Sequence, residues 1–214
     1  MGKIYRSIKN IAKKSPTLQI PSVTKMSLEG VLNDAFCGIK PGTTLDLGAG
    51  DCPYKHKVPH TEYFSLDIRR DCNPNIISDA HSLPFGNSTF DTVISTEVLE
   101  HIKNPEIMIS EMLRILRPCG ICIVSSPFLY PLHPRMNGYF LGDFHRFTLD
   151  EYKHLFREFS QLETFSHGNR ILVMWETICI GKQSILFNLL NPIVGAIRYK
   201  DERFHLGYVV KAKK

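Results

Sequence analysis

The sequence predicts an α/β protein built on a mostly parallel sheet with helices on both faces. Two observations support this fold class. Short apolar runs that suit buried strands alternate with segments of helical character, which is the pattern of crossover connections between parallel strands. In addition, a glycine-rich turn at residues 48–50 directly follows the first apolar run, at the strand end where such sheets bind ligands.

The first third of the chain supplies two of the expected strands. A helix is expected at about 25–38, followed by a strand at 44–48. The run YFSLD at 63–67 is the second strand, and it ends in an isolated acid. Between the two strands, only 53–57 has weak helical character.

Three further strands are predicted, at 75–78, 91–95 and 120–125. A helix at 104–117 separates the last two. Asn104 can cap this helix and Pro105 suits its first turn, whereas Pro118 and Gly120 end it. Its apolar positions form one broad face that can be buried on the sheet.

The segment 126–147 has three prolines, two glycines and many aromatic residues without any period. A long irregular stretch inside a compact domain is usually functional, so a substrate loop or lid is expected there. The predicted elements after it are a helix at 148–158, a strand at 161–166, a helix within 170–195 and a strand at 205–211. Thr148 and Glu151 form a capping box. All 214 residues are expected to form one domain, 1–214.

Positive charge is concentrated at the two ends of the chain. The net charge is +5, yet residues 1–25 carry six basic and no acidic residues, and residues 198–214 carry six basic and two acidic residues. The middle, 26–197, has 14 basic and 19 acidic residues. A nucleic-acid partner is therefore not expected, and the basic N-terminal extension suits either solvent or an anionic membrane surface.

The six cysteines show no disulfide framework, and nothing near Met1 resembles a signal peptide, so a cytoplasmic setting is expected. Cys119 and Cys122 have redox spacing but are expected to be structural thiols, and no metal is implied. The uncharged stretch 183–197 is too short and too polar to span a membrane. Together with the basic N-terminus, it suits peripheral contact with the inner face of the membrane.

The glycine-rich turn has the form Asp46-x-Gly48-x-Gly50. Glycine allows a ligand to approach the backbone, because it has no Cβ. A nicotinamide-binding turn would have a third glycine where this chain has Pro53. A phosphate-binding loop would continue with Gly-Lys-Ser/Thr, which is missing. The remaining feature is Asp67, which lies 17 residues beyond the turn.

Five segments in this order resemble class I S-adenosylmethionine-dependent methyltransferases of the small Rossmann-like kind, close to the type 11 group. They are LDLGAG at 45–50, SLDI at 65–68, SDAHSLPF at 78–85, FDTVISTEVLEHI at 90–102 and LRPCGICIV at 116–124. The resemblance covers about 40–125. It implies a Rossmann-like, seven-stranded sheet with the last strand antiparallel, and S-adenosylmethionine as the cofactor.

The resemblance also implies cofactor contacts at successive strand ends. The implied residues are Asp46, Gly48, Ala49, Gly50, Asp67, Ile68, Asp79, Ala80, Ser95, Thr96 and Glu97. The turn would lie against the amino-acid end of the cofactor, Asp67 would accept hydrogen bonds from the ribose hydroxyls, and Asp79 would bind the adenine amino group. Taken singly, Asp46 or Glu97 could equally cap a helix or face solvent.

A hydroxyl acceptor is a weak nucleophile, so its methylation benefits from a base. His101, after the fourth strand, and His133, after the fifth, are the candidate catalytic residues. His133 is preferred, because the Glu-His pair that includes His101 is common in the resembled family whatever the substrate. The candidate substrate-binding residues are Tyr130, Asp143, His145 and Arg146. The last of these suits a phosphate or carboxylate, or alternatively a surface ion pair.

The segments PFLYPLH and HRFT resemble those of methyltransferases among bacterial glycan and polysaccharide enzymes. This predicts O-methylation of a sugar or a lipid-linked glycan. One alternative is another small metabolite or lipid that reacts through oxygen, nitrogen or carbon, and another is a non-catalytic S-adenosylmethionine-binding protein. A nucleic-acid acceptor is not expected, since STEV follows the fourth strand where an Asn-Pro-Pro-aromatic tetrapeptide would be needed. The sequence does not predict the oligomeric state.

Overall fold

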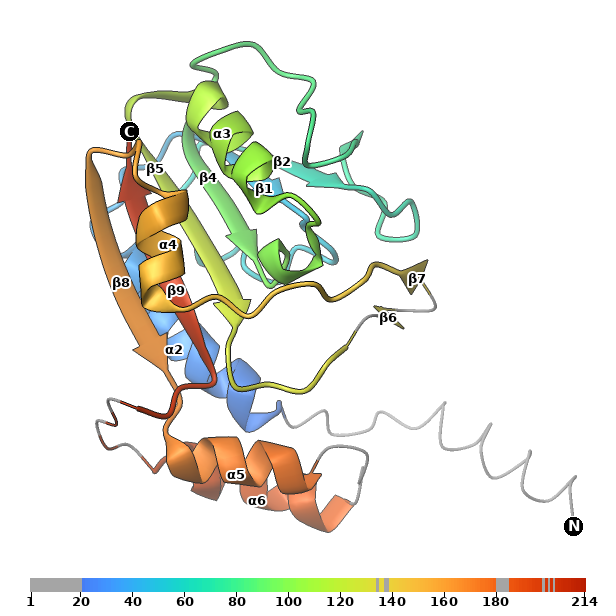
Figure 1. Cartoon of the computed structure of the whole chain (residues 1–214). Helices are drawn as coiled ribbons and strands as arrows, with labels where there is room; N and C mark the ends of the chain where they lie inside the picture. Colours follow the sequence, from blue (N-terminus) through green and yellow to red (C-terminus); the bar gives the residue numbers. More distant parts are fainter. Residues whose placement is uncertain are drawn as a thin grey trace, which may run out of the picture.

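The computed structural model describes residues 21–133, 135–136, 139–179, 185–197, 199, 201 and 203–214. Its centre is a seven-stranded sheet in the order β3-β2-β1-β4-β5-β9-β8 (Figure 1). The strands are β1 (Thr43–Leu47), β2 (Glu62–Asp67), β3 (Ile76–Ile77), β4 (Phe90–Thr96), β5 (Leu116–Pro127), β8 (Gln161–His167) and β9 (Gly207–Lys213). The strands from β1 to β5 pair in parallel, and β9 is antiparallel to both β5 and β8. The predicted Rossmann-like sheet with an antiparallel last strand is confirmed.

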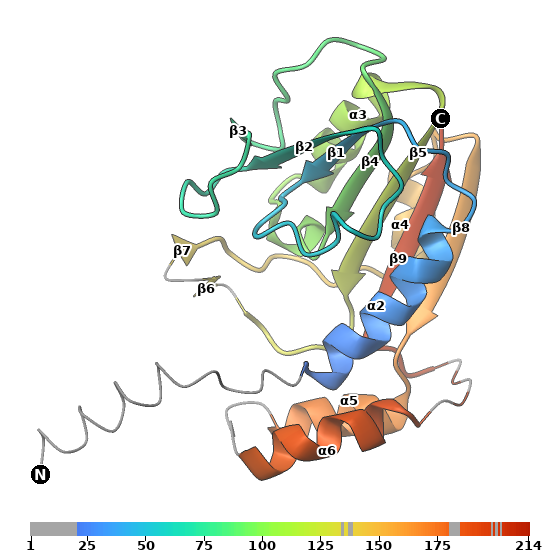
Figure 2. The same ribbon diagram turned by 180° about the vertical axis from the view of Figure 1, so that it is seen from behind.

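Helices cover both faces of the sheet. The helix α2 (Val23–Phe36) lies on one face, and α3 (Pro105–Ile115) and α4 (Leu149–Leu155) lie on the other (Figures 1 and 2). Each face has its own cluster of buried apolar side chains. A pair of helices, α5 (Arg170–Cys179) and α6 (Ile185–Gly195), packs beside α2 near the carboxyl ends of the parallel strands. Burial of apolar surface on both faces makes the sheet a rigid support for the loops at its strand ends.

Several predicted boundaries are corrected by the structure. The weak helix at 53–57 is wrong, because this segment forms successive turns, including a hydrogen bond from Lys57 N–H to the Tyr54 carbonyl at 2.9 Å. A helix of five residues cannot repay the cost of its own nucleation. The helix predicted at 104–117 ends at Ile115, because the backbone is already extended at Leu116 and pairs there with β4.

The two predicted helix caps differ in outcome. The Thr148 side chain accepts a hydrogen bond from the backbone N–H of Glu151 at 3.2 Å, so this half of the predicted capping box is confirmed. Asn104 occupies the N-cap position of α3, but its side chain makes no capping hydrogen bond. The sequence did not indicate the third cap, in which Ser22 accepts from Lys25 N–H at the start of α2.

The last third of the chain contains two helices, α5 and α6, where the sequence predicted one within 170–195. The stretch 126–147 is mostly irregular as expected, but it also contains the short antiparallel strands β6 (Arg135–Met136) and β7 (Tyr139–Phe140). Most of the basic N-terminal extension, 1–20, lies outside the described residues. The beginning of the apolar stretch 183–197 does so as well.

Among the helices that the structure describes, none is both long and apolar enough to cross a bilayer.

Candidate functional site

A cavity of about 770 Å³ opens at the carboxyl ends of β1, β2 and β4. Ligands bind at this edge of an open parallel sheet, because the loops that follow the strands converge there. The cavity wall contains ten of the residues predicted to act on the cofactor or in catalysis. They are Gly48, Ala49, Gly50, Asp67, Ile68, Asp79, Ala80, Thr96, Glu97 and His101.

The glycine turn requires its glycines for steric reasons. Gly48 has φ +74°, and a Cβ added there would lie 2.4 Å from Val98 Cγ2. Gly50 has φ +50°, and its N–H donates to Asp67 Oδ2 at 2.9 Å. The backbone is thus left bare on the cavity side, and the turn is tied to the end of the second strand.

Asp67 is nearly buried and accepts hydrogen bonds on both oxygens. Its Oδ1 accepts from the backbone N–H of Arg69 at 2.9 Å, and the guanidinium of the same arginine lies 3.3 and 3.4 Å from the two oxygens. An ionised carboxylate offers about four acceptor sites, and the long guanidinium contacts are the weaker ones. Ribose hydroxyls can therefore replace the guanidinium while both backbone bonds remain.

The ends of β2 and β3 provide an apolar surface and an acid. Ile68 is 58% exposed although it lines the cavity, which suits the flat face of an adenine ring. Asp79 accepts from the backbone N–H of His81 at 2.9 Å, and this bond holds the pKa of its carboxyl below the usual value. These residues fit the cofactor implied by the sequence, since a bare turn, a carboxylate and an apolar face follow one another along the cavity.

Two predicted cofactor residues lie beneath the cavity and do not line it. Ser95 is fully buried and donates to the Leu47 carbonyl at 2.9 Å. Asp46 is 1% exposed and accepts a hydrogen bond from the Tyr63 hydroxyl. Burial raises the pKa of Asp46 to about 6, although the bond from Tyr63 lowers it in part. Both residues brace the strands that carry the turn.

At the end of β4, the backbone turns sharply at Glu97. Glu97 has φ +55°, a conformation that residues with a Cβ adopt at a cost. Its N–H donates to Ser125 O at 3.1 Å, and its carboxylate accepts from the Ser125 hydroxyl at 2.8 Å. Burial raises the pKa of Glu97, and the charge of Glu100 raises it further. The short 3₁₀ helix η1 (Leu99–His101) follows and places Glu100 at 0% exposure.

The two predicted catalytic histidines lie together, with ring centroids 5.0 Å apart, and both face Glu100. The distance from Glu100 Oε1 is 3.8 Å to His101 Nε2 and 3.5 Å to His133 Nε2. The Glu100 carboxylate raises the pKa of His133, whereas burial lowers it. The structure therefore assembles a buried carboxylate and two imidazoles from the loops after β4 and β5.

Of the predicted substrate-binding residues, Asp143 holds His133 in place and is itself paired with Arg146. Asp143 accepts from the backbone N–H of His133 at 2.7 Å and pairs with Arg146 Nη2 at 2.8 Å. Arg146 also donates to the carbonyls of His145, Tyr130 and Pro131, so its guanidinium is engaged within the protein. The Tyr130 ring lies edge-on to His133 at 5.5 Å. His145 stacks on Phe147 instead, away from the cavity lining.

The sequence predictions missed two residues of the site. Arg69 was not predicted, because its contact with Asp67 depends on how the chain turns after β2. Glu100 was not predicted as a site residue either, although it directly precedes the candidate His101 in the sequence.

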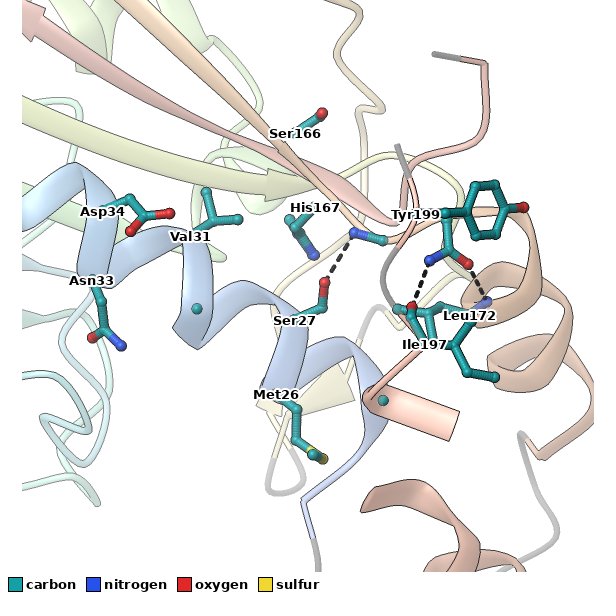
Figure 3. A pocket seen from close by; sticks show the side chains of 14 residues that line it. Met26, Ser27, Val31, Asn33, Asp34, Ser166, His167, Leu172, Ile197 and Tyr199 are labelled. Atoms are coloured by element: carbon teal, nitrogen blue, oxygen red, sulfur yellow. Dashed lines mark hydrogen bonds between the residues drawn. The ribbon is translucent and has the colours of Figure 1, made fainter. Parts of the chain in front are cut away.

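A second cavity, of about 590 Å³, lies between α2 and the chain that follows β8 (Figure 3). Here Gly168 N–H donates to the Ser27 hydroxyl at 2.9 Å, and Asn169 Nδ2 donates to the Ile197 carbonyl at 3.0 Å. His167 is buried in its wall. None of the predicted site residues lines this cavity.

Comparisons with known proteins found methyltransferases. The methyltransferase domain family matches residues 56–124. Norajmaline N-methyltransferase of Rauvolfia serpentina is 36% identical over 50 residues, which are 23% of this chain and 17% of that relative. The match to this relative is therefore confined to a small part of its length.

Solved structures match nearly the whole fold. A SAM-dependent methyltransferase of Thermotoga maritima superposes with a TM-score of 0.57 at 14% identity, covering 100% of both chains. Phosphoethanolamine N-methyltransferase 2 of Haemonchus contortus, in complex with S-adenosyl-L-methionine, superposes with a TM-score of 0.56 at 17% identity. That match covers 87% of this chain and 51% of the other. At such identities, the likeness is one of fold.

Proposed function

Because this chain is an S-adenosylmethionine-dependent methyltransferase with the Rossmann-like fold of class I, we propose that it methylates a hydroxyl group of a sugar, free or within a lipid-linked glycan. One observation carries this proposal: the Glu100–His133 pair, with its 3.5 Å separation, beside the cofactor cavity. A hydroxyl is the acceptor that needs such a pair, since it must lose a proton to become a good nucleophile.

When bound, S-adenosylmethionine supplies an electrophilic methyl group on a sulfonium. The glycine turn and Asp67 would hold the cofactor against the strand ends, so that the side chains of η1 and of the loop after β5 would meet the acceptor. Transfer would join the acceptor oxygen to the methyl carbon as the bond from that carbon to sulfur breaks. In the simplest form of the reaction, the acceptor proton passes to His133 Nε2, and Asp143 fixes the position of this residue.

The polarity of the acceptor side supports a sugar. Glu97 and His101 line the cavity, and Glu100 lies 3.8 Å from His101 Nε2, so the hydroxyl groups of an acceptor can form hydrogen bonds with polar side chains there. Arg146 is occupied by Asp143, which argues against a phosphate bound at that guanidinium.

An amine acceptor is the second candidate, and the same carboxylates favour it, because they attract an ammonium group. Both the matched plant enzyme and the matched nematode enzyme are named as N-methyltransferases. The two candidates differ in their need for a base. His133→Gln should reduce kcat for a hydroxyl acceptor about a hundredfold or more, whereas an amine that already presents a lone pair should lose much less.

The test is a product assay by mass spectrometry. Purified protein with S-adenosylmethionine is offered nucleotide sugars, lipid-linked saccharides and small amines. The expected result is a sugar that gains one methyl group at oxygen. Methylation of amines alone would refute the proposal. The exposed Glu106→Gln variant of α3 is the matched control for His133→Gln, and it should retain the wild-type rate.

We also propose that the protein contacts an anionic membrane surface through α5 and α6. Six large apolar side chains of these helices are exposed, namely Ile171, Met174, Ile178, Leu189, Leu190 and Ile193. The described chain begins beside them, since Asn191 Nδ2 donates to the Pro21 carbonyl at 3.1 Å. The residues before this point are rich in lysine and arginine and contain no acid. Apolar side chains next to basic charge are the requirements for interfacial binding.

Sedimentation with vesicles tests this contact. Binding to phosphatidylcholine vesicles that contain phosphatidylglycerol should exceed binding to pure phosphatidylcholine and should fall as salt is added. Met174→Glu with Ile193→Glu should abolish it, whereas Ile107→Glu, at an exposed apolar position on α3, should not. Equal sedimentation of all three proteins would contradict the proposed surface.

A further inference from the structure

Three acceptor atoms converge beside the cofactor cavity, whose wall includes His101. Glu100 is fully buried, and its Oε1 faces the Nε2 atoms of His101 and His133 at 3.8 and 3.5 Å. Within the part of the chain that the structure describes, neither carboxylate oxygen of Glu100 has a hydrogen-bond partner, and His101 Nε2 has none either. A buried carboxylate without partners is costly, so this arrangement calls for a positively charged group at its centre.

The proton positions on both imidazoles follow from their other contacts. His101 Nδ1 lies 2.6 Å from the Gly142 carbonyl, which can only accept, so Nδ1 carries the proton and Nε2 presents a lone pair. His133 Nδ1 faces the Pro131 carbonyl at 3.2 Å and Asp143 Oδ2 at 3.3 Å, with the same consequence. An N–H given to a carbonyl or carboxylate, with the other nitrogen free, is the arrangement of a metal-binding histidine.

We propose that Glu100, His101 and His133 bind a divalent cation whose remaining coordination positions take the acceptor hydroxyl. The second half of this inference rests on the proposed function, and the first half does not. The three ligand atoms all lie within 4.8 Å of one another. Ligands held at about 2.1 Å from one cation are roughly 3.0–4.2 Å apart, so both separations from Glu100 fit and only small movements are needed.

The ligand types indicate which cation binds. Two imidazoles and one carboxylate with open positions suit Mn²⁺, Co²⁺ or Zn²⁺ better than Mg²⁺, which prefers an all-oxygen shell. Charge also favours a cation, because the Glu100 carboxylate is fully buried while Arg146 is already paired with Asp143.

The cation changes the role of His133 from base to ligand. The acceptor hydroxyl binds the cation through its oxygen, which weakens the O–H bond, and its proton passes to solvent water. The oxygen then forms its bond to the methyl carbon while the bond between that carbon and sulfur breaks, so the sulfonium leaves as a neutral thioether. No oxidant or reductant is required.

Manganese binding by the tag-free full chain tests the site independently of activity. Mn²⁺ is titrated by electron paramagnetic resonance with S-adenosylhomocysteine present, and spin-echo modulation detects imidazole nitrogens on the bound ion. The expected result is one Mn²⁺ per chain with nitrogen coupling. Glu100→Gln and His133→Gln should each weaken binding more than about tenfold, since even changes outside the ligand shell cost that much. Glu106→Gln is the matched charge control and should bind as the wild type does.

The possible results test the cation site and the proposed acceptor separately. Absence of Mn²⁺ binding in a folded protein that binds S-adenosylhomocysteine overturns the cation site and leaves His133 as a free base. Equal binding by wild type and Glu100→Gln overturns it too, because the ion then lies elsewhere. Binding at these residues without any O-methylated product overturns the proposed acceptor but not the site. Circular dichroism of each variant checks that it is folded.

Discussion

Asp67 makes the hydrogen bonds that connect the glycine turn to the end of β2. It accepts from the Gly50 backbone at 2.9 Å and, through its other oxygen, from Arg69 N–H at the same distance. A carboxylate in this position orders the turn before any ligand arrives, and it still has lone pairs for two ribose hydroxyls. The same side chain thus contributes to both the shape and the affinity of the cavity.

Replacement of Asp67 by asparagine should weaken S-adenosylhomocysteine binding by about tenfold or more, since a hydrogen bond to a charged group contributes about 1.5–3 kcal/mol. Isothermal titration calorimetry measures the change. Asp71→Asn, a nearby exposed position, should bind with wild-type affinity. Equal affinities for the two variants would show that Asp67 does not contact the ribose.

His167 makes stability depend on pH. Its side chain is 3% exposed, neither ring nitrogen has a hydrogen-bond partner among the described residues, and burial lowers its pKa to about 3, with His205 adding to the effect. Between that value and the usual 6.5, the unfolded chain binds a proton that the folded chain does not. The free energy of unfolding therefore rises with pH across this window. The contribution of the neutral His167 to stability is lost as the pH falls below about 6.5.

Urea unfolding at pH 7.5 and pH 5.5 measures this contribution. The wild type should lose about 1.4 kcal/mol at the lower pH from this one group. His167→Gln should lose that much less, whereas exposed His154→Gln should behave as the wild type does. An unchanged pH dependence in His167→Gln would assign the effect to another group.

At the scale of elements, the loops after β1 and β4 depend on each other. The Gly48 position is closed to a side chain because Val98, just after β4, occupies the space. The Glu97 backbone, at φ +55°, starts the turn that brings Val98 there. The glycine turn and the turn that follows β4 are thus shaped by one contact between neighbouring strand ends.

Gly48→Ala should lower stability by more than about 2 kcal/mol and should abolish S-adenosylhomocysteine binding, because both the φ angle and the 2.4 Å contact with Val98 are prohibitive. The double variant with Val98→Ala relieves the contact and should recover part of the melting temperature. Gly86→Ala, where the nearest atom would be 3.8 Å away, should have little effect. A stable Gly48→Ala protein that binds cofactor would contradict this account.

The strands and their order were predictable, because apolar runs of β-prone residues end in turn residues or acids at each strand end. The segment 53–57 was not, since its weak helical character could not reveal that so short a stretch would form only turns. Likewise, the sequence marked Pro118 and Gly120 as the end of α3. The helix ends earlier because Leu116 gains more by pairing with Phe90 in the sheet.

In the candidate site, most residues predicted to bind the cofactor line the cavity, whereas His101 alone does so among the predicted catalytic and substrate-binding residues. The glycine turn and Asp67 are close in sequence and have a recognisable spacing. Asp46 belongs to the same motif, yet its side chain lies beneath the strands, where it accepts a hydrogen bond from the Tyr63 hydroxyl. The meeting of Glu100 with His133 joins residues 33 positions apart, and only the parallel pairing of β4 with β5 brings them together.

At the scale of the whole molecule, the last strand, β9, joins β8 to the rest of the sheet. It lies between β5 and β8 and pairs with both along its length. Without it, β8 has no partner, since its pairing is with β9. The seven-stranded sheet is therefore complete only when the last strand has paired with β5 and β8.

Truncation after Leu206 removes β9 and should abolish the cooperative unfolding transition, because two long ladders of hydrogen bonds are lost. Removal of Lys214 alone should cost far less, since it deletes the contacts of one amino group with the carbonyls of Leu113 and Leu116. Differential scanning calorimetry distinguishes the two cases. A sharp transition in the longer truncation would mean that β8 can pair elsewhere.

The direction of β9 also determines how the enzyme can be handled. Because this strand runs antiparallel to its neighbours, the C-terminus emerges at the amino ends of the parallel strands, at the opposite edge from the cavity (Figure 1). A linker, a fluorescent reporter or a solid support attached there stays clear of both cofactor and acceptor. Immobilised protein should therefore remain open to substrates as large as a glycan chain.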